Sequence, residues 1–393
     1  MNKTSVSPGF LLAKGSIITS SLAAVLFSAS AFAQSELPDV SDVGIQEVKS
    51  WASERIEEAE SNFSNTGLSR EESPGYWGNE LVYQVFVDRF NNGDPSNDNA
   101  NLHGSQSFYQ DGPNSWEVHE WRHGGDIQGI IDRLDYIVDL GMTSIWITPV
   151  FKHRGTYHGY CTTDFTQIDP GFGTNELFRE FVQEAHARNI KVILDVVLNH
   201  MCDDNTTYSL EPAHEECADD LHAKNLNGSN GGSNNQGILD FSSNFFSPLK
   251  SQYFFNRCGA NTVDETGGTD PVSVFGDFTA DMYDFDTRNH DFQKIFTDLH
   301  KYWIAYADID GFRLDAAKHV TEDFVAYFST EVRDYAKSIG KNNFYIVGEV
   351  AGPAEWIGRR LGNMFHNPEN PNKHGNVPVT LTNLVLGFQS KYL

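Results

Sequence analysis

The sequence predicts an α/β fold built around a parallel sheet. Residues 81–89 alternate and are rich in β-forming side chains, residues 126–140 carry apolar side chains at helical spacing, and residues 143–150 are again strand-like. Residues 191–198 form an apolar run of the kind found in strands buried on both faces. Strands that alternate with helices imply a parallel sheet, with a helix predicted at 176–188 before the third strand.

The alternation stops after Met201. From there to about residue 278 the chain is dense in Gly, Asn, Ser and Asp. A structureless loop of that length is improbable inside a compact domain, so we predict a small inserted domain at 201–285. Beyond it the same patterns predict a helix at 292–307, a strand ending at Asp315, a helix at 322–339 and a strand at 344–350. A further helix at 354–361 and a strand or helix at 377–388 follow.

The first 33 residues have the pattern of a secretory signal peptide. Lys3 and Lys14 give a basic start, residues 17–27 are apolar, and Ala31 and Ala33 fit a cleavage site. Outside the signal we expect no membrane span, and the localisation we predict is secreted or periplasmic. Residues 34–76 are predicted to be an N-terminal extension or linker, with a helix near 48–63.

Charge and cysteine content narrow the function classes. The net charge of −26 repels nucleic acid and anionic membrane surfaces, and it suits neutral substrates and cations. Four cysteines in an exported chain suggest two disulfides with three possible pairings, of which Cys202–Cys217 is our first choice. Their spacing matches no zinc pattern.

The chemistry is centred on the stretch D-I-D-G-F-R-L-D-A-A-K-H-V at 308–320. Arg313 and Asp315 are two apart, so on a strand they point to the same side. A neighbouring arginine favours the ionised carboxylate, which a nucleophile at a sugar carbon needs. A buried ion pair that only holds the strand in place is the alternative.

Four motifs together resemble the α-amylase family of retaining enzymes that act on α-glucosides. They are Y-H-G-Y-C-T-T-D at 157–164, D-V-V-L-N-H at 195–200, G-F-R-L-D-A-A-K-H at 311–319 and G-E-V at 348–350. The resemblance implies a (β/α)8 TIM-type barrel with an irregular domain inserted after strand three, so that 77–200 and 286–393 are its two parts. Only five or six strands are found, and the family's third carboxylate motif does not follow Glu349. We therefore expect a barrel incomplete at its C-terminal end, and we interpret the N-H-D at 289–291 as a helix cap.

The resemblance assigns the two carboxyls that cleave the glycosidic bond. Asp315 is the expected nucleophile and Glu349 the expected general acid and base, about 5 Å apart as retention requires. The apolar residues around Glu349 would help to keep it protonated.

The same resemblance assigns the residues that hold substrate. Tyr160 would stack on the sugar ring beside His158, and His200 would contact a sugar hydroxyl. Ordinary loop packing is the alternative for Tyr160. Lys318 and His319 would lie on the leaving-group side, and Arg313 completes the substrate-binding set. Cys161 stands where the family often has an aromatic residue.

Two calcium sites are implied by resemblance. Asn199, Asp284 and the backbone carbonyl of His319 would bind the Ca²⁺ ion that joins barrel and insert. A second site is similar to a loop of cyclodextrin glucanotransferases, although a polar loop without metal is the alternative. Its expected ligands are Asn92, Asp94, Asn97, Asp98, Gly124 and Asp126.

These observations predict an exported, calcium-dependent and monomeric enzyme. It would hydrolyse α-1,4 bonds of α-glucan polysaccharides or maltooligosaccharides with retention. A cyclodextrin-forming or branching transglycosylase, and a truncated glucan-binding protein without activity, remain as alternatives.

Overall fold

A five-stranded parallel sheet organises the protein. The structure is a computed structural model, and it describes residues 44–102, 121–202, 247–249, 251–256, 261, 272–278 and 282–350. The strands lie in the order β1-β2-β5-β8-β9, and every neighbouring pair is parallel. They are β1 (Val82–Val85), β2 (Ser144–Ile147), β5 (Lys191–Val197), β8 (Gly311–Asp315) and β9 (Tyr345–Gly348). All five predicted strands are therefore confirmed, each shorter than its sequence pattern.

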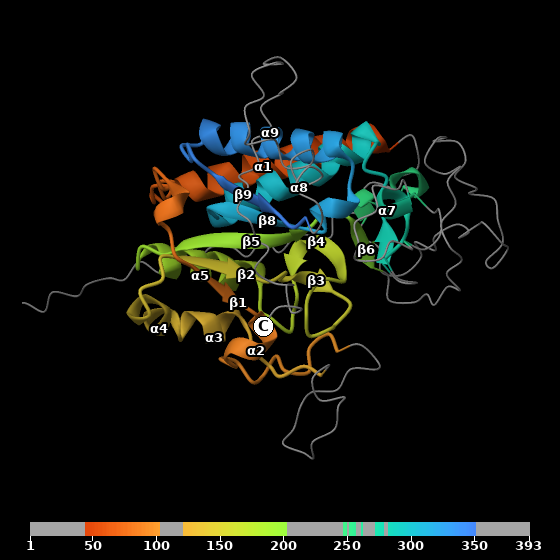
Figure 1. Ribbon diagram of the computed structural model, residues 1–393. Helices are drawn as coiled ribbons and strands as arrows, with labels where there is room; N and C mark the ends of the chain where they lie inside the picture. The colour runs from red at the N-terminus through yellow and green to blue at the C-terminus, as the bar shows by residue number, and fades with distance from the viewer. Residues whose placement is uncertain are drawn as a thin grey trace, which may run out of the picture. The chain divides into compact units, whose positions relative to one another are not determined.

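The helices differ from the sequence expectation in two places. Residues 81–89 are not one strand, because β1 ends at Val85 and the short helix α2 (Val87–Phe90) follows. The helix expected at 126–140 is divided into α3 (Ile127–Ile131) and α4 (Leu134–Asp139). The other predicted helices are confirmed as α5 (Asn175–His186), α8 (His290–Ala307) and α9 (Glu322–Ser338). In Figure 1, α8 and α9 lie beside β8 and β9, whereas α3, α4 and α5 lie beside β1 and β2.

The start of α8 explains the N-H-D tripeptide. Asn289 is the N-cap, and its side chain accepts hydrogen bonds from the backbone N–H groups of Asp291 and Phe292. A cap of this kind satisfies donors that have no partner within the helix. The helix ends at Asp308, which adopts a left-handed conformation with φ of 63°. The interpretation of N-H-D as a helix cap is confirmed.

Helix α1 (Ile45–Asn65) packs lengthwise on α8, and it confirms the helix expected near 48–63. Val48, Ala52, Ile56, Ala59 and Phe63 recur at helical spacing and are all buried. The described part of the extension thus contributes to the core rather than acting as a free linker.

Two small antiparallel pairs follow the carboxyl ends of β2 and β5, and the sequence analysis missed both. A hairpin joins β3 (Phe151–His153) to β4 (Thr162–Ile168). Strands β6 (His200–Cys202) and β7 (Met282–Asp284) pair across the predicted insert. The two ends of the predicted insert are therefore hydrogen-bonded to each other through β6 and β7. The short elements are η1 (Trp77–Asn79), η3 (Ser247–Leu249), η4 (Gln252–Phe254), α7 (Val272–Phe275) and η5 (Ala317–His319).

The disulfide corrects our first choice of pairing. Cys161, at the end of the β3–β4 loop, is bonded to Cys202 in β6, with Cα atoms 5.2 Å apart. The pairing Cys202–Cys217 is therefore wrong. The two partners are distant in sequence, and the packing of the hairpin against β6 brings them together. Cys217 and Cys258 lie outside the described residues, as do the signal peptide and the elements expected at 354–361 and 377–388. Among the helices that are described, none has the length and apolar character needed to cross a membrane.

Candidate active site

The sheet register brings four functional side chains to one end of the strands. Asp195 in β5 pairs with Arg313 in β8, which pairs in turn with Val347 in β9. Two residues further along β8 is Asp315, and Glu349 directly follows β9. Side chains two apart on a strand share a face, so Arg313 and Asp315 point the same way. The carboxyl ends of parallel strands are where barrel enzymes place their catalytic groups.

Arg313 lies at the centre of the site and contacts three carboxylates. Its Nη1 lies 2.9 Å from Oδ1 of Asp195 and 2.6 Å from Oδ1 of Asp315, while its Nη2 lies 2.7 Å from Oε2 of Glu349. One guanidinium thus contacts all three carboxylates. Asp315 and Glu349, the two carboxyls that we expect to perform the reaction, therefore share Arg313 as an ion-pair partner.

Asp195 is the structural anchor of the cluster. Its Oδ2 accepts hydrogen bonds from the Trp146 indole at 3.0 Å and from the Tyr160 hydroxyl at 3.1 Å, in addition to Arg313. The carboxylate is fully buried. Trp146 lies in β2, and sequence reasoning missed it. The only signal in the sequence for its role was an aromatic ring with an N–H donor between two isoleucines of a buried strand.

The protonation of this cluster departs from the expectation that Arg313 simply keeps Asp315 ionised. Burial raises the pKa of Asp315 well above its usual value, and the negative charges of Asp195 and Glu349 add to the effect, although Arg313 opposes it. Burial also raises the pKa of Asp195. Burial lowers the pKa of Arg313, but the three carboxylates outweigh it and the net direction is upward. Burial and the neighbouring charges together therefore favour the protonated forms of Asp315 and Asp195.

Glu349 occupies the more open position. Its side chain is 29% exposed, against 12% for Asp315. The Ala316 N–H donates to Oε2 of Glu349 at 3.3 Å. Ala316 has φ of 52°, a left-handed conformation that costs a non-glycine residue energy, and such strain is concentrated at functional sites. Ile346 and Val347 are buried as expected, yet the carboxylate itself lies against Arg313.

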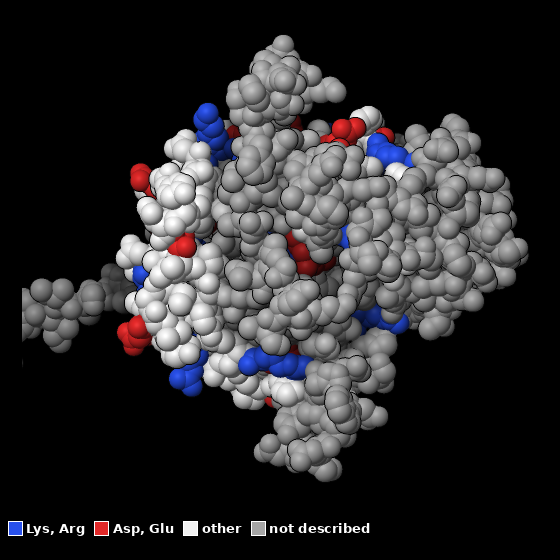
Figure 2. Space-filling view, viewed as in Figure 1, with Lys and Arg blue, Asp and Glu red and all other residues white. Residues whose placement is uncertain are grey.

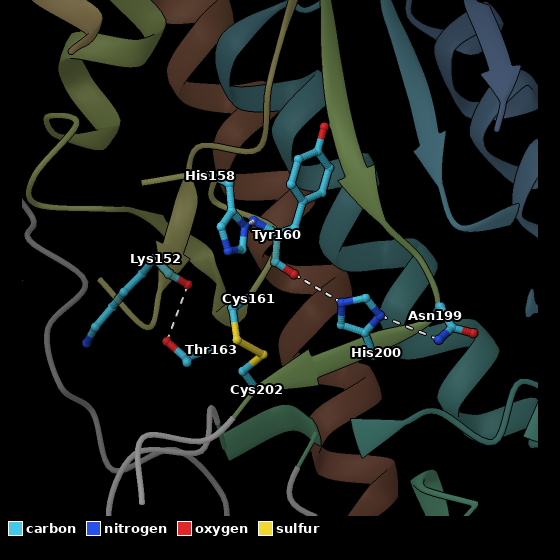
Figure 3. Close-up of a disulfide and its surroundings, with 8 residues drawn as sticks. All are labelled: Lys152, His158, Tyr160, Cys161, Thr163, Asn199, His200 and Cys202. Atoms are coloured by element: carbon cyan, nitrogen blue, oxygen red, sulfur yellow. Dashed lines mark hydrogen bonds between the residues drawn. A yellow bond between two sulfur atoms is a disulfide. The ribbon is translucent and has the colours of Figure 1, made fainter. Parts of the chain in front are cut away.

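Tyr160 bridges the carboxylate cluster and the β3–β4 loop. Its ring points away from the disulfide, while its carbonyl points toward the His200 imidazole (Figure 3). The His200 Nε2–H donates to that carbonyl at 3.0 Å, and Nδ1 accepts from the Asn199 amide at 3.4 Å. A single neutral tautomer satisfies both contacts. His200 is buried, so the sugar contact expected for it stays a prediction.

The remaining expected substrate residues lie around this cluster. The His158 ring stacks on Tyr160 with centroids 5.9 Å apart, and its Nδ1 accepts from the Tyr160 N–H at 3.0 Å. Lys318 and His319 form the short helix η5 just after Asp315. The Lys318 N–H donates to the backbone carbonyl of Glu349. The His319 ring packs on Phe278 with centroids 4.6 Å apart.

Two buried oxygens mark a candidate cation centre beside β6. Oδ1 of Asn199 and Oδ1 of Asp284 are both buried and have no hydrogen-bond partner in the structure. They belong to facing segments, because Asp284 pairs with His200. A buried acceptor without a partner is costly, and a hard cation would remove that cost. The residues present therefore fit the calcium ion that the sequence implies.

The negative charges around Asp284 also favour a bound cation at this place. Burial raises the pKa of Asp284 well above its usual value, and Asp277 and Asp286 add to the shift. Asp277 is itself buried, and its Oδ1 accepts from the Asp284 N–H at 2.8 Å. Sequence reasoning missed Asp277, because nothing around it in the insert marked its role.

The second predicted calcium site, in the loop 92–98, fits a calcium ion less completely than the site at Asn199 and Asp284 does. Oδ1 of Asn97 is buried without a partner, which suits a ligand. Asn92 donates to Asp98 at 2.7 Å, and burial raises the pKa of Asp98. The Asp126 carboxylate, however, accepts four hydrogen bonds and caps α3. These fill its lone-pair sites.

The other expected members of the loop have local roles. Oδ1 of Asp94 accepts from Ser96, which lowers the pKa of Asp94. Gly124 has φ of 83°. Within the described residues, no three His, Cys, Asp or Glu side chains group as a metal site, so either calcium site would also need amide and backbone oxygens.

On the face shown in Figure 2, acidic side chains are visible near the centre of the view, and most of the visible Lys and Arg side chains lie toward its periphery. A site with three carboxylates, an arginine and a tyrosine suits a neutral polyhydroxylated ligand better than an anion.

Comparison with known proteins agrees with this geometry. The family model "Alpha amylase, catalytic domain" matches residues 84–360. The chain belongs to the alpha-amylase family. This confirms the expected barrel fold class, and the five parallel strands are the part of the barrel that the structure describes.

The relatives of this alpha-amylase family chain include several kinds of enzyme. It is 34% identical over 71% of its length to a cyclomaltodextrinase of Thermoanaerobacter pseudethanolicus, covering 40% of that protein. It is 33% identical over 76% of its length to an intracellular maltogenic amylase of Bacillus subtilis, covering 42%. It is 31% identical over 70% of its length to a cyclomaltodextrin glucanotransferase of Klebsiella oxytoca, covering 38%. The chain thus spans about 40% of the length of these curated relatives.

Among solved structures, an Anoxybacillus alpha-amylase is similar with a TM-score of 0.50 and 31% identity. The match covers 74% of this chain and 52% of that one.

Proposed function

We propose that the protein is a glycoside hydrolase that cleaves α-1,4 bonds of starch-like α-glucans with retention of configuration. One observation carries the proposal. Asp315 and Glu349, at the ends of adjacent parallel strands, contact the same guanidinium group. Two carboxyls on either side of one bond, one buried and one open to a leaving group, suit the double displacement.

The residues have separate tasks in this reaction. Glu349, the more exposed carboxyl, gives its proton to the glycosidic oxygen as that bond breaks. Asp315 attacks the anomeric carbon and forms a glycosyl ester. Glu349 then removes a proton from water, the water oxygen bonds to the anomeric carbon, and the ester bond to Asp315 breaks.

The test is turnover of starch and maltoheptaose by the protein and by two isosteric variants. We expect Asp315→Asn and Glu349→Gln each to lower kcat by a factor of about 10³ or more, because each removes a group that bonds to, or transfers a proton at, the reacting atoms. Stereochemistry is read by NMR from the anomer released first. Wild-type rates in either variant, or release of the inverted anomer, would refute the assignment.

Transglycosylation is the second candidate, and the similarity to the Klebsiella glucanotransferase favours considering it. Both reactions share the glycosyl ester and differ only in whether water or a sugar hydroxyl attacks it. Chromatography of the products formed from starch separates them, since cyclic products mean transfer. Binding of maltoheptaose with no turnover would instead support a glucan-binding protein without activity.

We further propose that the protein binds Ca²⁺ and is exported. The unpartnered oxygens of Asn199 and Asp284 support a calcium ion at the root of the insert. The Cys161–Cys202 disulfide supports folding in an oxidising compartment, in keeping with the signal-like pattern of residues 1–33. Fractionation of expressing cells would test export, and protein found only in the cytoplasm would contradict it. A monomeric state stays a prediction.

A further inference from the structure

The loop that carries Tyr160 has no regular secondary structure. It runs from Arg154 to Cys161 between the hairpin strands, and Gly155 and Gly159 both have positive φ. Gly159 passes so close to the end of β2 that a Cβ there would lie 2.1 Å from the Pro149 carbonyl oxygen. Such loops are more mobile than the strands they join. A substrate platform on this loop therefore needs an external restraint.

Two links connect the loop to β6. They start from consecutive residues of the loop and end at residues two apart in β6. The carbonyl of Tyr160 accepts from Nε2 of His200, and the next residue, Cys161, is bonded to Cys202, two residues after His200 (Figure 3). Cys161 is 3% exposed and Cys202 is fully buried. Because solvent reductants do not reach the bond in the folded protein, it serves as a permanent restraint rather than a redox switch.

The restraint reaches the reacting groups through Tyr160. The hydroxyl of Tyr160 donates to Asp195, and Arg313 lies 5.9 Å from the ring centroid. A shift of the loop would move the ring and weaken a hydrogen bond inside the carboxylate cluster. A displacement of about 1 Å in a supporting element can lower the rate about 10²-fold.

We propose that the Cys161–Cys202 disulfide is a positioning element of the candidate active site, which fixes Tyr160 and His200 relative to the carboxylate cluster. The proposal rests on the proposed function. It assigns the disulfide a part in the efficiency of turnover in addition to its part in stability. Neither cysteine touches the reacting atoms, so the effect passes through Tyr160 and His200.

Three variants test the proposal: Cys161→Ser, Cys202→Ser and the double variant. All three break the same bond, so we expect the same loss of kcat/KM on maltoheptaose, about 10- to 100-fold, with the double variant no worse than either single one. Rates are measured well below each Tm and per folded molecule. Wild-type kcat and KM in the double variant would overturn the proposal, as would single losses that multiply in the double variant.

Ile56→Ala is the matched control. It removes buried volume from α1, remote from the cluster, and should lower Tm while leaving kcat and KM unchanged. If the serine variants do not fold, the combined change Cys161→Ala/Cys202→Val, which puts no hydroxyl into the buried site, takes their place with the same expected loss.

The design separates failure of this proposal from failure of the proposed function. If the wild-type protein turns over neither starch nor maltoheptaose, the proposed function fails. Positioning is then measured by tryptophan fluorescence titration with maltoheptaose, since Trp146 borders the cluster. At least tenfold weaker binding in the double variant would support the restraint, and equal affinity would overturn it.

Discussion

Asp310 shows how one buried carboxylate can make stability depend on pH. It lies just before β8, at the opposite end of that strand from Asp315. Its carboxylate contacts Lys341 at 2.9 Å, His186 at 2.7 Å and the Val192 N–H at 2.8 Å. Burial opposes ionisation, but these partners outweigh it and lower the pKa of Asp310 to about 2.

This predicts an acid-dependent loss of stability. Because the folded pKa is below the unfolded value, the stabilisation is complete above about pH 4 and is lost as pH falls through about 2. Asp310→Asn should cost about 2–4 kcal/mol at pH 7, since it also leaves Lys341 buried with only Asp308 as a counter-ion.

Urea unfolding at pH 7 and pH 3 would measure both effects. The variant should lose less stability between the two values than the wild-type protein does. Equal losses would show that Asp310 is not the group responsible.

Arg313 plays the comparable part at the other end of the strand, where its partners include the two proposed catalytic carboxyls. It contacts Asp195, Asp315 and Glu349 together, and the charges of Asp195 and Glu349 raise the pKa of Asp315. The sequence predicted the Arg313–Asp315 pair from spacing alone. It did not predict that burial would raise the pKa of Asp315, because burial is a property of the packed site and not of the motif.

At the scale of elements, α1 forms part of the packed core. Its buried face packs on α8, and the chain that follows binds the end of that helix through Arg70. The Arg70 guanidinium donates to the carbonyls of Ile304 at 3.2 Å and Ala305 at 3.0 Å. These carbonyls lie in the last turn of α8, where the Ile304 carbonyl also accepts from the Asp308 N–H, and a cation at this end of a helix is favourable.

Two neighbouring substitutions on α1 should differ sharply in effect. Ile56→Ala removes a buried side chain and should cost about 2–4 kcal/mol, whereas exposed Glu57→Ala should stay within about 0.5 kcal/mol of wild type. The free energies come from denaturant unfolding of the purified protein. Similar small costs for both would show that α1 does not pack on the barrel core as described.

The hairpin and the β6–β7 pair are the elements that sequence patterns did not reveal. Three of their four strands, β3, β6 and β7, have only three residues each, and β4 is buried at nearly every position instead of at alternate ones. Period-two alternation cannot be recognised over such lengths. These unpredicted elements carry Cys161 and Cys202, which is why the pairing could not be inferred from spacing.

On the scale of the whole molecule, excess negative charge favours a bound cation. The chain carries a net charge of −26, and the charges of Asp277 and Asp286 raise the pKa of the buried Asp284 in β7, although Arg288 pairs with Asp286 and opposes the shift. Neighbouring buried carboxylates repel one another unless a positive charge lies between them. A calcium ion bound only by the folded state would stabilise it by mass action.

Calcium removal should therefore lower the melting temperature. We expect EDTA to reduce Tm by about 5 °C or more, and added Ca²⁺ to restore it, in calorimetry at constant ionic strength. Asn199→Ala, which removes one proposed ligand oxygen, should diminish the response. An unchanged melting curve in EDTA would count against both calcium sites.

The sequence by itself predicted the order of strands and helices, and the resemblance carried by its motifs implied the barrel class and the residues that we propose to carry the chemistry. It could do so because the apolar periodicity of the long elements is local, and because the motif at 311–319 fixes which residues lie together on one strand. Tertiary structure alone decided which distant groups meet. The Trp146 and Tyr160 contacts to Asp195, the packing of α1, the Cys161–Cys202 bond and the direction of the Asp315 pKa all depend on non-local packing. Contacts between residues that are distant in sequence produce no repeating pattern of residue types, so the sequence alone does not reveal them.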